Sequence, residues 1–176
     1  MSGPAVYLAG PEVFLPHARE IGAAKRRICA AYGLTGLFPI DDERPATTAA
    51  AIFAGNLALM RRADAVVANL SPFRSPGADP GTAFEAGFMS ALGRPVFAYS
   101  NLPGSMLERM RASGAAVMAD DGTWRDADGR WIEDFGLADN LMLAVAADVL
   151  SPAEPCPLDD LTLFEACIRR AAALLR

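Results

Sequence analysis

The sequence predicts an α/β protein, a flavodoxin-like, doubly wound parallel sheet of five strands with helices on both faces. A small hairpin and a C-terminal helix are additions to that sheet. Short apolar runs alternate with segments of helical composition, which is typical of parallel strands joined by crossover helices. Glycine or proline marks several of the boundaries. The runs expected to be strands are Ala5–Ala9, Leu34–Ile40, Ala65–Leu70, Pro95–Tyr99 and the weak run Ala115–Ala119.

The helices are predicted from apolar periodicity and from signals at their ends. Residues 17–32 read as an amphipathic helix that stops at Gly33, with an apolar stripe formed by Ile21, Ala24, Ile28 and Ala31. A second helix is expected over Ala49–Arg62, with Ile52 and Leu59 on its apolar side. A third covers residues 80–92, with Asp79 as N-cap, Pro80 as first residue and Gly93 as stop.

The second half of the chain has weaker signals. Leu107–Ser113 reads as a short helix, and Trp124–Trp131 as a hairpin around Asp128-Gly129. Asn140–Leu150 reads as an apolar helix start. A proline-rich link, Ser151–Pro157, then leads to a final helix over residues 159–175. There is no internal repeat, and we expect one domain over residues 1–176.

Composition narrows the possible functions. The net charge is −5, and the only basic cluster is Lys25-Arg26-Arg27, so nucleic acid is not an expected partner. No apolar run reaches the ~20 residues of a membrane helix, and no signal peptide is recognised, so a cytoplasmic protein is expected. Three scattered cysteines fit a reducing compartment. With His17 as the sole histidine, no histidine-based metal site or catalytic triad is expected.

The stretch from Ala78 to Phe88 contains the main candidate for chemistry, Glu85. Glu85 falls about one and a half turns inside a helix that opens at the carboxyl end of a strand, where α/β sheets build their sites. The helix dipole there favours an ionised carboxylate, and an oriented carboxylate can be a nucleophile. Small neighbours, among them Gly81 and Gly87, would let a ligand approach closely. The structural alternative is that Asp79 is only a cap and Glu85 only a partner of the dipole.

Other candidates lie along the same expected edge. Tyr7, in the first strand, is on pattern alone more often a core residue than a catalytic one. The loop after that strand contains Gly10 and Phe14, and Phe14 either stacks on a ligand ring or fixes the loop. This loop lacks the G-x-G-x-x-G of a dinucleotide fold. Asp41 follows the second strand as a candidate for the rim of the site, and Asn56 is a polar residue in mid-helix. The loop Ser71–Ala78 is long enough to act as a lid.

Three pieces of the sequence together resemble the nucleoside 2-deoxyribosyltransferase family. They are Tyr7 in V-Y-L-A-G-P-E-V-F, Asp79 six residues before Glu85 in D-P-G-T-A-F-E-A-G-F, and Asn140-Leu141-Met142. The segment over residues 133–143 is similar to members described as purine or general deoxyribosyltransferases. The resemblance covers residues 5 to about 150.

The resemblance implies roles for these residues. Glu85 would be the nucleophile on the anomeric carbon, Tyr7 would orient its carboxylate, and Asp79 would bind the substrate. Gly10 and Gly81 would lie against the substrate. Asn140 would reach a sugar hydroxyl from a neighbouring subunit of a dimer-based tetramer or hexamer, with Met142 packing nearby. The sequence departs from some members at Asn56, where an aspartate is common, and an amide cannot donate the proton that an acid can. Asp79 or Asp41 would then protonate the leaving base.

The resemblance implies exchange of deoxyribonucleosides with free nucleobases, with retention and without a metal or organic cofactor. Two other functions remain open. A deoxynucleoside or deoxynucleotide N-glycosidase on the same scaffold would need donors for a phosphate, and an acid at Glu12 argues against them. A nucleotide- or flavin-binding module without catalysis would leave the small residues around Glu85 unexplained.

Overall fold

The computed structural model describes residues 3–40 and 48–175. Its centre is a five-stranded sheet in the order β2-β1-β3-β4-β7, and every pairing is parallel. This is the flavodoxin-like order that the sequence predicts. The strands of this sheet are β1 (Ala5–Ala9), β2 (Thr35–Leu37), β3 (Ala65–Asn69), β4 (Val96–Tyr99) and β7 (Asp148–Leu150).

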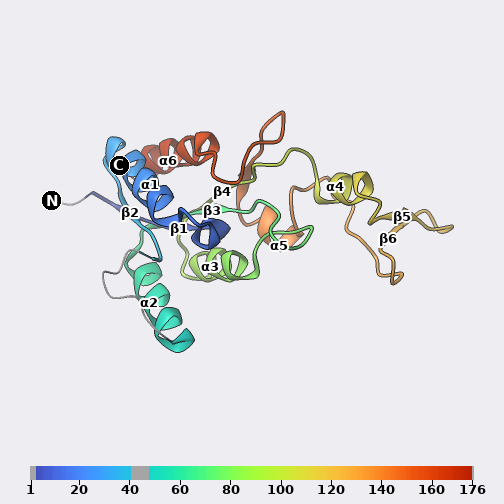
Figure 1. The fold of residues 1–176 in the computed structure, drawn as a ribbon, viewed down its shortest axis with the longest axis horizontal. Coiled ribbons are helices and arrows are strands. Elements are labelled where there is room, and N and C mark those ends of the chain that lie inside the picture. The colour runs from blue at the N-terminus through green and yellow to red at the C-terminus, as the bar shows by residue number, and fades with distance from the viewer. Residues whose placement is uncertain (1–2, 41–47, 176) are drawn as a thin grey trace.

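Helices cover both faces of the sheet (Figure 1). On one face α1 (Ala18–Ala31) and α6 (Thr162–Leu174) pack together, and on the other lie α2 (Ala49–Arg62) and α3 (Pro80–Ala91). Shorter elements are the 3-10 helix η1 (Pro11–Phe14), α4 (Met106–Ala112), α5 (Leu141–Ala144) and the strands β5 (Val117–Met118) and β6 (Trp124–Arg125). None of the helices in the described residues has the length and hydropathy needed to cross a bilayer.

The alternation of side chains along β1 divides the core into two layers. Val6 and Leu8 belong to the cluster beneath α1 and α6, together with Phe164 and Ile168. Tyr7 and Ala9 face the opposite layer, which α2 and α3 cover. Tyr7 is fully buried there, so its phenol must find a hydrogen-bond partner inside the protein.

The fifth strand is not the one that the sequence predicts. Val117 and Met118 form β5, which pairs antiparallel with β6 in a separate two-stranded sheet. The edge strand of the main sheet is β7, where Val149 lies opposite Ala98. The predicted helix over Asn140–Leu150 therefore ends early, at Ala144. Periodicity cannot separate a helix from a strand in an apolar run this short, and pairing with β4 decides the outcome.

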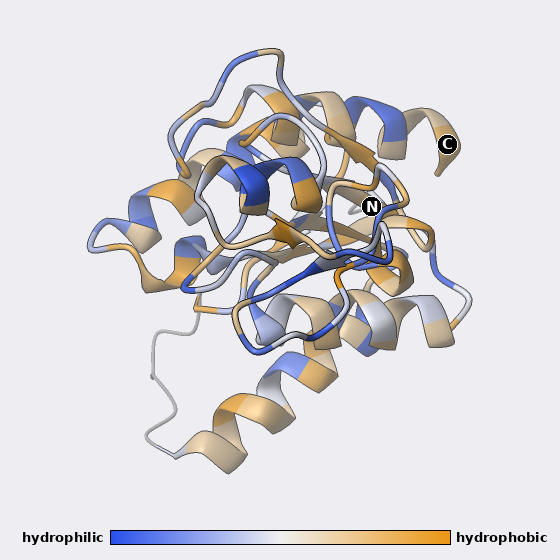
Figure 2. Cartoon of the chain, turned by 90° about the vertical axis from the view of Figure 1, so that its right-hand side faces the viewer, coloured by the Kyte–Doolittle hydropathy of each residue, from blue (hydrophilic) through white to orange (hydrophobic). Residues whose placement is uncertain are grey.

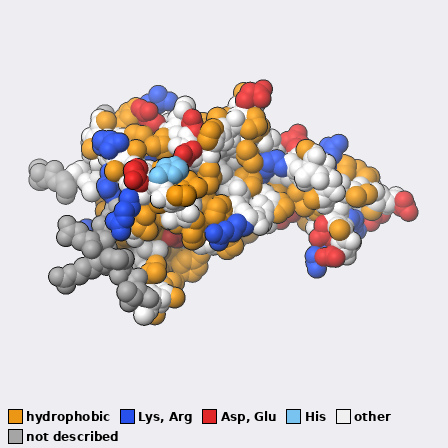
Figure 3. All heavy atoms as spheres, viewed as in Figure 1, with side chains coloured by type: hydrophobic (Ala, Val, Ile, Leu, Met, Phe, Trp, Pro, Cys, Tyr) orange, Lys and Arg blue, Asp and Glu red, His pale blue; other side chains and the backbone are white. Residues whose placement is uncertain are grey.

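The segment from α4 to β6 forms an arm that extends away from the sheet (Figure 1). It has a small core of its own, made by Leu107, Ala116 and Ile132. The predicted hairpin over Trp124–Trp131 exists as a tight turn, closed by a single bridge between Arg125 and Trp131. The paired strands of the arm are instead β5 and β6, joined by the turn in which Thr123 accepts from Ala119. Figure 3 shows hydrophobic and charged side chains mixed on the surface of this arm.

Candidate active site

The start of α3 is built by the cap that the sequence predicts. The Asp79 carboxylate accepts from the backbone N–H of Thr82 at 3.0 Å and from its hydroxyl at 3.3 Å, and Pro80 is the first helical residue. A Cβ at position 81 would lie 2.9 Å from Asp79 Oδ2, so Gly81 leaves room for the capping carboxylate. Asp79 therefore caps α3 through Oδ2, and its Oδ1 takes no part in this cap.

Glu85 and Tyr7 meet across the layer between α3 and the sheet. The Tyr7 hydroxyl donates to Glu85 Oε1 at 2.5 Å, joining residues that are 78 positions apart in the chain. Tyr7 is fully buried and Glu85 is half-buried, so the phenol holds one carboxylate oxygen from the protein side. A carboxylate held in this way has a fixed orientation, which is what a nucleophile or an electrostatic stabiliser requires.

The pKa values of Glu85 and Tyr7 are both raised, and that of Glu85 falls close to neutral pH. Burial raises the pKa of Glu85 to about 7; the Tyr7 hydrogen bond acts in the opposite direction, and the charge of Asp79 raises it further. The expected effect of the helix dipole is therefore outweighed by burial. Burial, together with the charge and the hydrogen bond of Glu85, raises the pKa of Tyr7 well above its usual value, so the phenol stays protonated and donates.

The loop after β1 is supported from below by a buried ion pair. Glu12 Oε1 accepts from Lys25 Nζ at 2.6 Å, from Asn69 Nδ2 at 2.9 Å and from the Tyr99 hydroxyl at 2.9 Å. Both charged side chains are buried, and Glu12 Oε2 has no hydrogen-bond partner among the described residues. A Cβ at Gly10 would lie 2.0 Å from that oxygen, so only glycine fits there. Glu12 thus presents no free charge to a ligand, and the sequence argument that it opposes phosphate is wrong.

The rim of the loop consists of an aromatic pair and an arginine. Phe14 stacks on Phe73 with ring centroids 5.4 Å apart, and the Arg74 guanidinium lies 4.9 Å and 4.7 Å from the two rings. Arg74 adopts a φ of 58°, a left-handed conformation that is uncommon outside glycine. Phe14 is about half exposed (52%), so this stacked group lies at the surface of the protein.

The remaining candidates from the sequence do not all join this cluster. Asn56 is half-buried on α2, one turn before Met60, which packs in the same layer as Tyr7. Asp41 lies outside the described residues. Asn140 is exposed and bonds to Glu133 and to the backbone of Met142, and Met142 is 74% exposed. Among the described residues no hydrogen bond joins Asn140 to Glu85 or Tyr7, although α5, which Asn140 caps, packs against α3.

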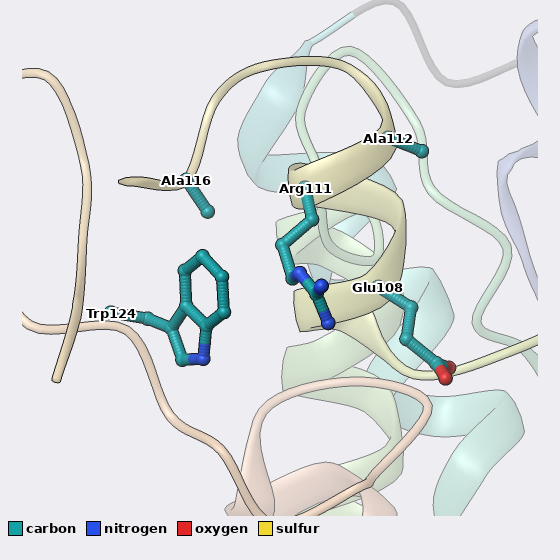
Figure 4. A pocket seen from close by; sticks show the side chains of 5 residues that line it. All are labelled: Glu108, Arg111, Ala112, Ala116 and Trp124. Carbon is teal, nitrogen blue, oxygen red and sulfur yellow. The ribbon is translucent and has the colours of Figure 1, made fainter. Parts of the chain in front are cut away.

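A cavity in the described part of the chain lies away from this site. It has a volume of about 500 Å³ and lies in the arm, lined by Glu108, Arg111, Ala112, Ala116 and Trp124. Figure 4 shows the Arg111 guanidinium beside the Trp124 indole, with Glu108 directed away from that ring. These groups supply no nucleophile held by a base, whereas Glu85 is bonded to a buried donor. Glu85 is therefore the candidate for the reactive group, on its geometry and not on cavity size.

Sequence reasoning missed the groups that support the site. Lys25 falls on the buried stripe of α1, four residues after Ile21 and four before Cys29, and all three are buried. A lysine at that spacing needs a buried partner, and this signal could have identified Glu12. Asp139 was missed as well. It is buried, and its Oδ2 accepts from the N–H of Ala78 at 2.8 Å, just before the Asp79 cap.

The fold and the site define a flavodoxin-like α/β protein whose candidate reactive group is a carboxylate held by a buried phenol. The sequence profile of the nucleoside 2-deoxyribosyltransferase family matches residues 6–142. The chain belongs to that family and is accordingly an enzyme.

Three known proteins illustrate this relationship. The 2-desoxiribosyltransferase from Leishmania mexicana has 33% sequence identity and a TM-score of 0.75, with 97% of each chain covered. An uncharacterised protein of Schizosaccharomyces pombe is 32% identical over 157 residues, which is 79% of this chain and 74% of the relative. A conserved protein from Enterococcus faecalis shares the fold, with a TM-score of 0.56 and 19% identity over 96% of this chain and 99% of the other.

Two substitutions should move the pH dependence of activity in opposite directions. If ionised Glu85 is the reacting form, kcat/KM should fall as the pH drops through about 7. Tyr7→Phe removes the hydrogen bond that lowers the pKa of Glu85, so this acid limb should move to higher pH. In Tyr7→Phe, kcat/KM on the acid side of the profile should fall ~10-fold or more, which corresponds to ~1.4 kcal/mol of transition-state stabilisation. Asp79→Asn removes the charge that raises this pKa and keeps a good N-cap, so the limb should move to lower pH, even though the loss of Asp79 also lowers the rate. Shifts of the same sign in both variants would contradict this assignment.

Proposed function

We propose that this protein transfers the 2-deoxyribosyl group between nucleobases, through a covalent intermediate on Glu85 and with retention of configuration. The hydrogen bond of 2.5 Å between Tyr7 and Glu85 carries this proposal. In this bond the carboxylate of Glu85, near the start of α3, is oriented by the buried hydroxyl of Tyr7 in β1. The membership of the chain in this family further supports a nucleophilic role for Glu85. Residues 1–176 carry the reaction as a single domain.

The reaction consists of two displacements at the anomeric carbon. In the first, Glu85 forms a bond to that carbon while the bond to the base nitrogen breaks, and the electron pair leaves with the base. The transition state resembles an oxocarbenium ion, which the carboxylate stabilises. In the second, the nitrogen of another base displaces Glu85 from the opposite face, so the two inversions give retention. Asp79 binds the substrate. The leaving nitrogen takes up a proton from the protonated form of Asp79 or of Asp41, because Asn56 cannot donate one as an acid, and the same group takes a proton back from the incoming base in the second displacement.

The test is to incubate the protein with deoxyinosine and adenine and to separate the products. Formation of deoxyadenosine supports transfer. Free hypoxanthine without deoxyadenosine indicates hydrolysis, and unchanged substrates indicate a binding module. The substrates in this proposal are deoxyribonucleosides and free nucleobases. We propose that the protein acts in the cytoplasm, a reducing compartment in which its three free cysteines would stay reduced.

A deoxynucleotide N-glycosidase is the second candidate, and Arg74 is the observation that favours it. This guanidinium lies over Phe14 at the rim of the β1 loop and is exposed, so it could bind a phosphate. Replacing deoxyinosine by its 5-monophosphate in the same assay separates the two candidates. Faster release of hypoxanthine from the monophosphate, lost in Arg74→Ala, would favour the glycosidase.

We further propose a homo-oligomer in which Asn140 and Met142 complete the site of a neighbouring subunit. An apolar surface beside Glu85 supports this. Phe53 of α2 and Phe84 of α3 are each about half exposed, with ring centroids 5.9 Å apart, and Phe84 also stacks near Phe88. Figure 2 shows α2 projecting from the body with largely hydrophobic residues along it. Exposed aromatic clusters of this kind usually mark interfaces.

Complementation between two inactive variants tests the shared site. Glu85→Ala and Asn140→Ala are each expected to be nearly inactive. After dissociation, mixing and reassembly, some interfaces pair an intact Glu85 with an intact Asn140, so part of the activity should return. Each variant reassembled alone is the control and should stay inactive. If reassembly is verified and no activity returns, both residues act within one chain. A monomer by light scattering at working concentration would reject the shared site sooner.

A further inference from the structure

The segment before α5 contains a carboxylate, Glu133, whose two oxygens are both committed to the Asn140 region. Glu133 Oε1 accepts from Asn140 Nδ2 at 2.7 Å, and Oε2 accepts from the backbone N–H of Leu141 at 2.9 Å. A carboxylate only accepts hydrogen bonds, so the end of the Asn140 amide that faces Glu133 must be its NH₂ group.

The other end of the same amide is fixed as well. Asn140 Oδ1 accepts from the backbone N–H of Met142 at 3.0 Å and thereby caps α5. A flipped amide would place NH₂ against that N–H and its oxygen against the Glu133 carboxylate, which is two repulsive contacts. The orientation of this exposed side chain is therefore determined at both ends. One N–H and one lone pair remain free to face outward.

Asp139 links the backbone of Asn140 to the segment that leads into α3, the helix that bears Glu85. Asp139 Oδ1 accepts from the Asn140 N–H at 2.7 Å, and Oδ2 accepts from Ala78 at 2.8 Å. Nearby, Arg109 donates to the Ala138 carbonyl at 2.5 Å; burial lowers the pKa of Arg109, and the charge of Asp139 acts against that. Asp139 thus fixes the backbone position of Asn140, and Glu133 fixes the orientation of the Asn140 side-chain amide.

We propose that Glu133 is a positioning residue that holds the amide of Asn140 in the orientation that reads a sugar hydroxyl. This rests on the proposed function, in which Asn140 contacts the deoxyribosyl group of a neighbouring site. A hydroxyl both donates and accepts, so it matches an amide that offers one N–H and one lone pair in fixed places. Both oxygens of Glu133 are bonded within its own chain, so we assign it no contact with the substrate.

The test is a double-mutant cycle between Glu133 and Asn140. In Glu133→Gln one of the two acceptor positions becomes an NH₂ group, so the amide of Asn140 loses its unique orientation. We expect KM for deoxyinosine to rise ~10-fold with a smaller change in kcat, a factor that corresponds to ~1.4 kcal/mol. In the Asn140→Ala background, measured at high enzyme concentration, the same substitution should change the residual activity less than twofold. The control is Asp134→Asn, at an exposed neighbour, which should behave as wild type.

The outcomes separate this inference from the function on which it rests. If the wild-type protein exchanges bases but Glu133→Gln has unchanged kinetics, the positioning role is wrong and the transferase stands. Equal losses in both backgrounds would show that Glu133 acts on folding or on another residue, and would also overturn the role. If the wild type forms no deoxyadenosine, the proposed function fails and this inference falls with it.

Discussion

Replacing Glu85 by Ala or Gln is expected to abolish base exchange, lowering kcat by ~1,000-fold or more, because the residue that forms the bond to the anomeric carbon is lost. The two variants answer different questions. Glu85→Gln keeps an oxygen that can accept from the buried Tyr7 hydroxyl, so its fold should be as stable as that of the wild type. Glu85→Ala leaves this hydroxyl without its acceptor and should be somewhat less stable.

The measurement is the rate of deoxyadenosine formation from deoxyinosine and adenine, with thermal unfolding recorded for each variant. Ser90→Ala is the control, because Ser90 is exposed on the same helix and should not affect exchange. Near-normal exchange by Glu85→Gln would show that another residue bonds to the sugar.

The second large effect concerns stability. Lys25→Met should lower the free energy of unfolding by about 3–5 kcal/mol, because it leaves the carboxylate of Glu12 buried without its cation. The Lys25 ammonium also lies 4.9 Å from the centre of the Phe164 ring, so the substitution removes a cation–π contact in the same place. Urea unfolding followed by circular dichroism measures the change.

A double variant provides the matched control. Glu12→Gln combined with Lys25→Met removes both charges and keeps an oxygen that Asn69 and Tyr99 can donate to. We expect this pair to recover much of the lost stability, since replacing a whole buried ion pair costs far less than breaking one. A single variant that loses under ~1 kcal/mol, or a double variant as unstable as the single, would contradict the view that this ion pair supports the β1 loop.

The parts of this fold that the sequence predicts well are those with local signals. The cap at Asp79, the proline at position 80 and the helix Ala49–Arg62 are all confirmed, because caps and periodic stripes are encoded by neighbours in the chain. The fifth strand was predicted wrongly because Val149 and Leu150 become a strand only through pairing with β4. Such pairing is a long-range event that no local window contains.

The same division applies to the site. Glu85 could be singled out from its small neighbours and its place after a strand, but a buried tyrosine in β1 looks like core until its partner is known. The hydrogen bond between the two spans 78 positions of sequence. The sequence prediction includes Lys25 only as part of a basic cluster and Glu12 only as an acid of the β1 loop, although the position of Lys25 on the apolar stripe of α1 is a signal of its burial. Asp139 and Glu133 accept from backbone N–H groups that are 61 and 8 positions away in the chain, and contacts at such separations leave no local pattern in the sequence.

The most direct test of the central claim is to locate the covalent intermediate. The wild-type protein is mixed with deoxyinosine without an acceptor base, quenched within one turnover, digested and analysed by mass spectrometry. We predict a deoxyribosyl group on the peptide that contains Glu85, formed together with one equivalent of free hypoxanthine per site. In Glu85→Gln we expect neither the modified peptide nor this release of hypoxanthine. A deoxyribosyl group on any other residue would contradict the claim. Intersecting lines in double-reciprocal plots of the initial exchange rate against deoxyinosine concentration, recorded at several fixed adenine concentrations, would also contradict the claim. A double displacement requires these lines to be parallel.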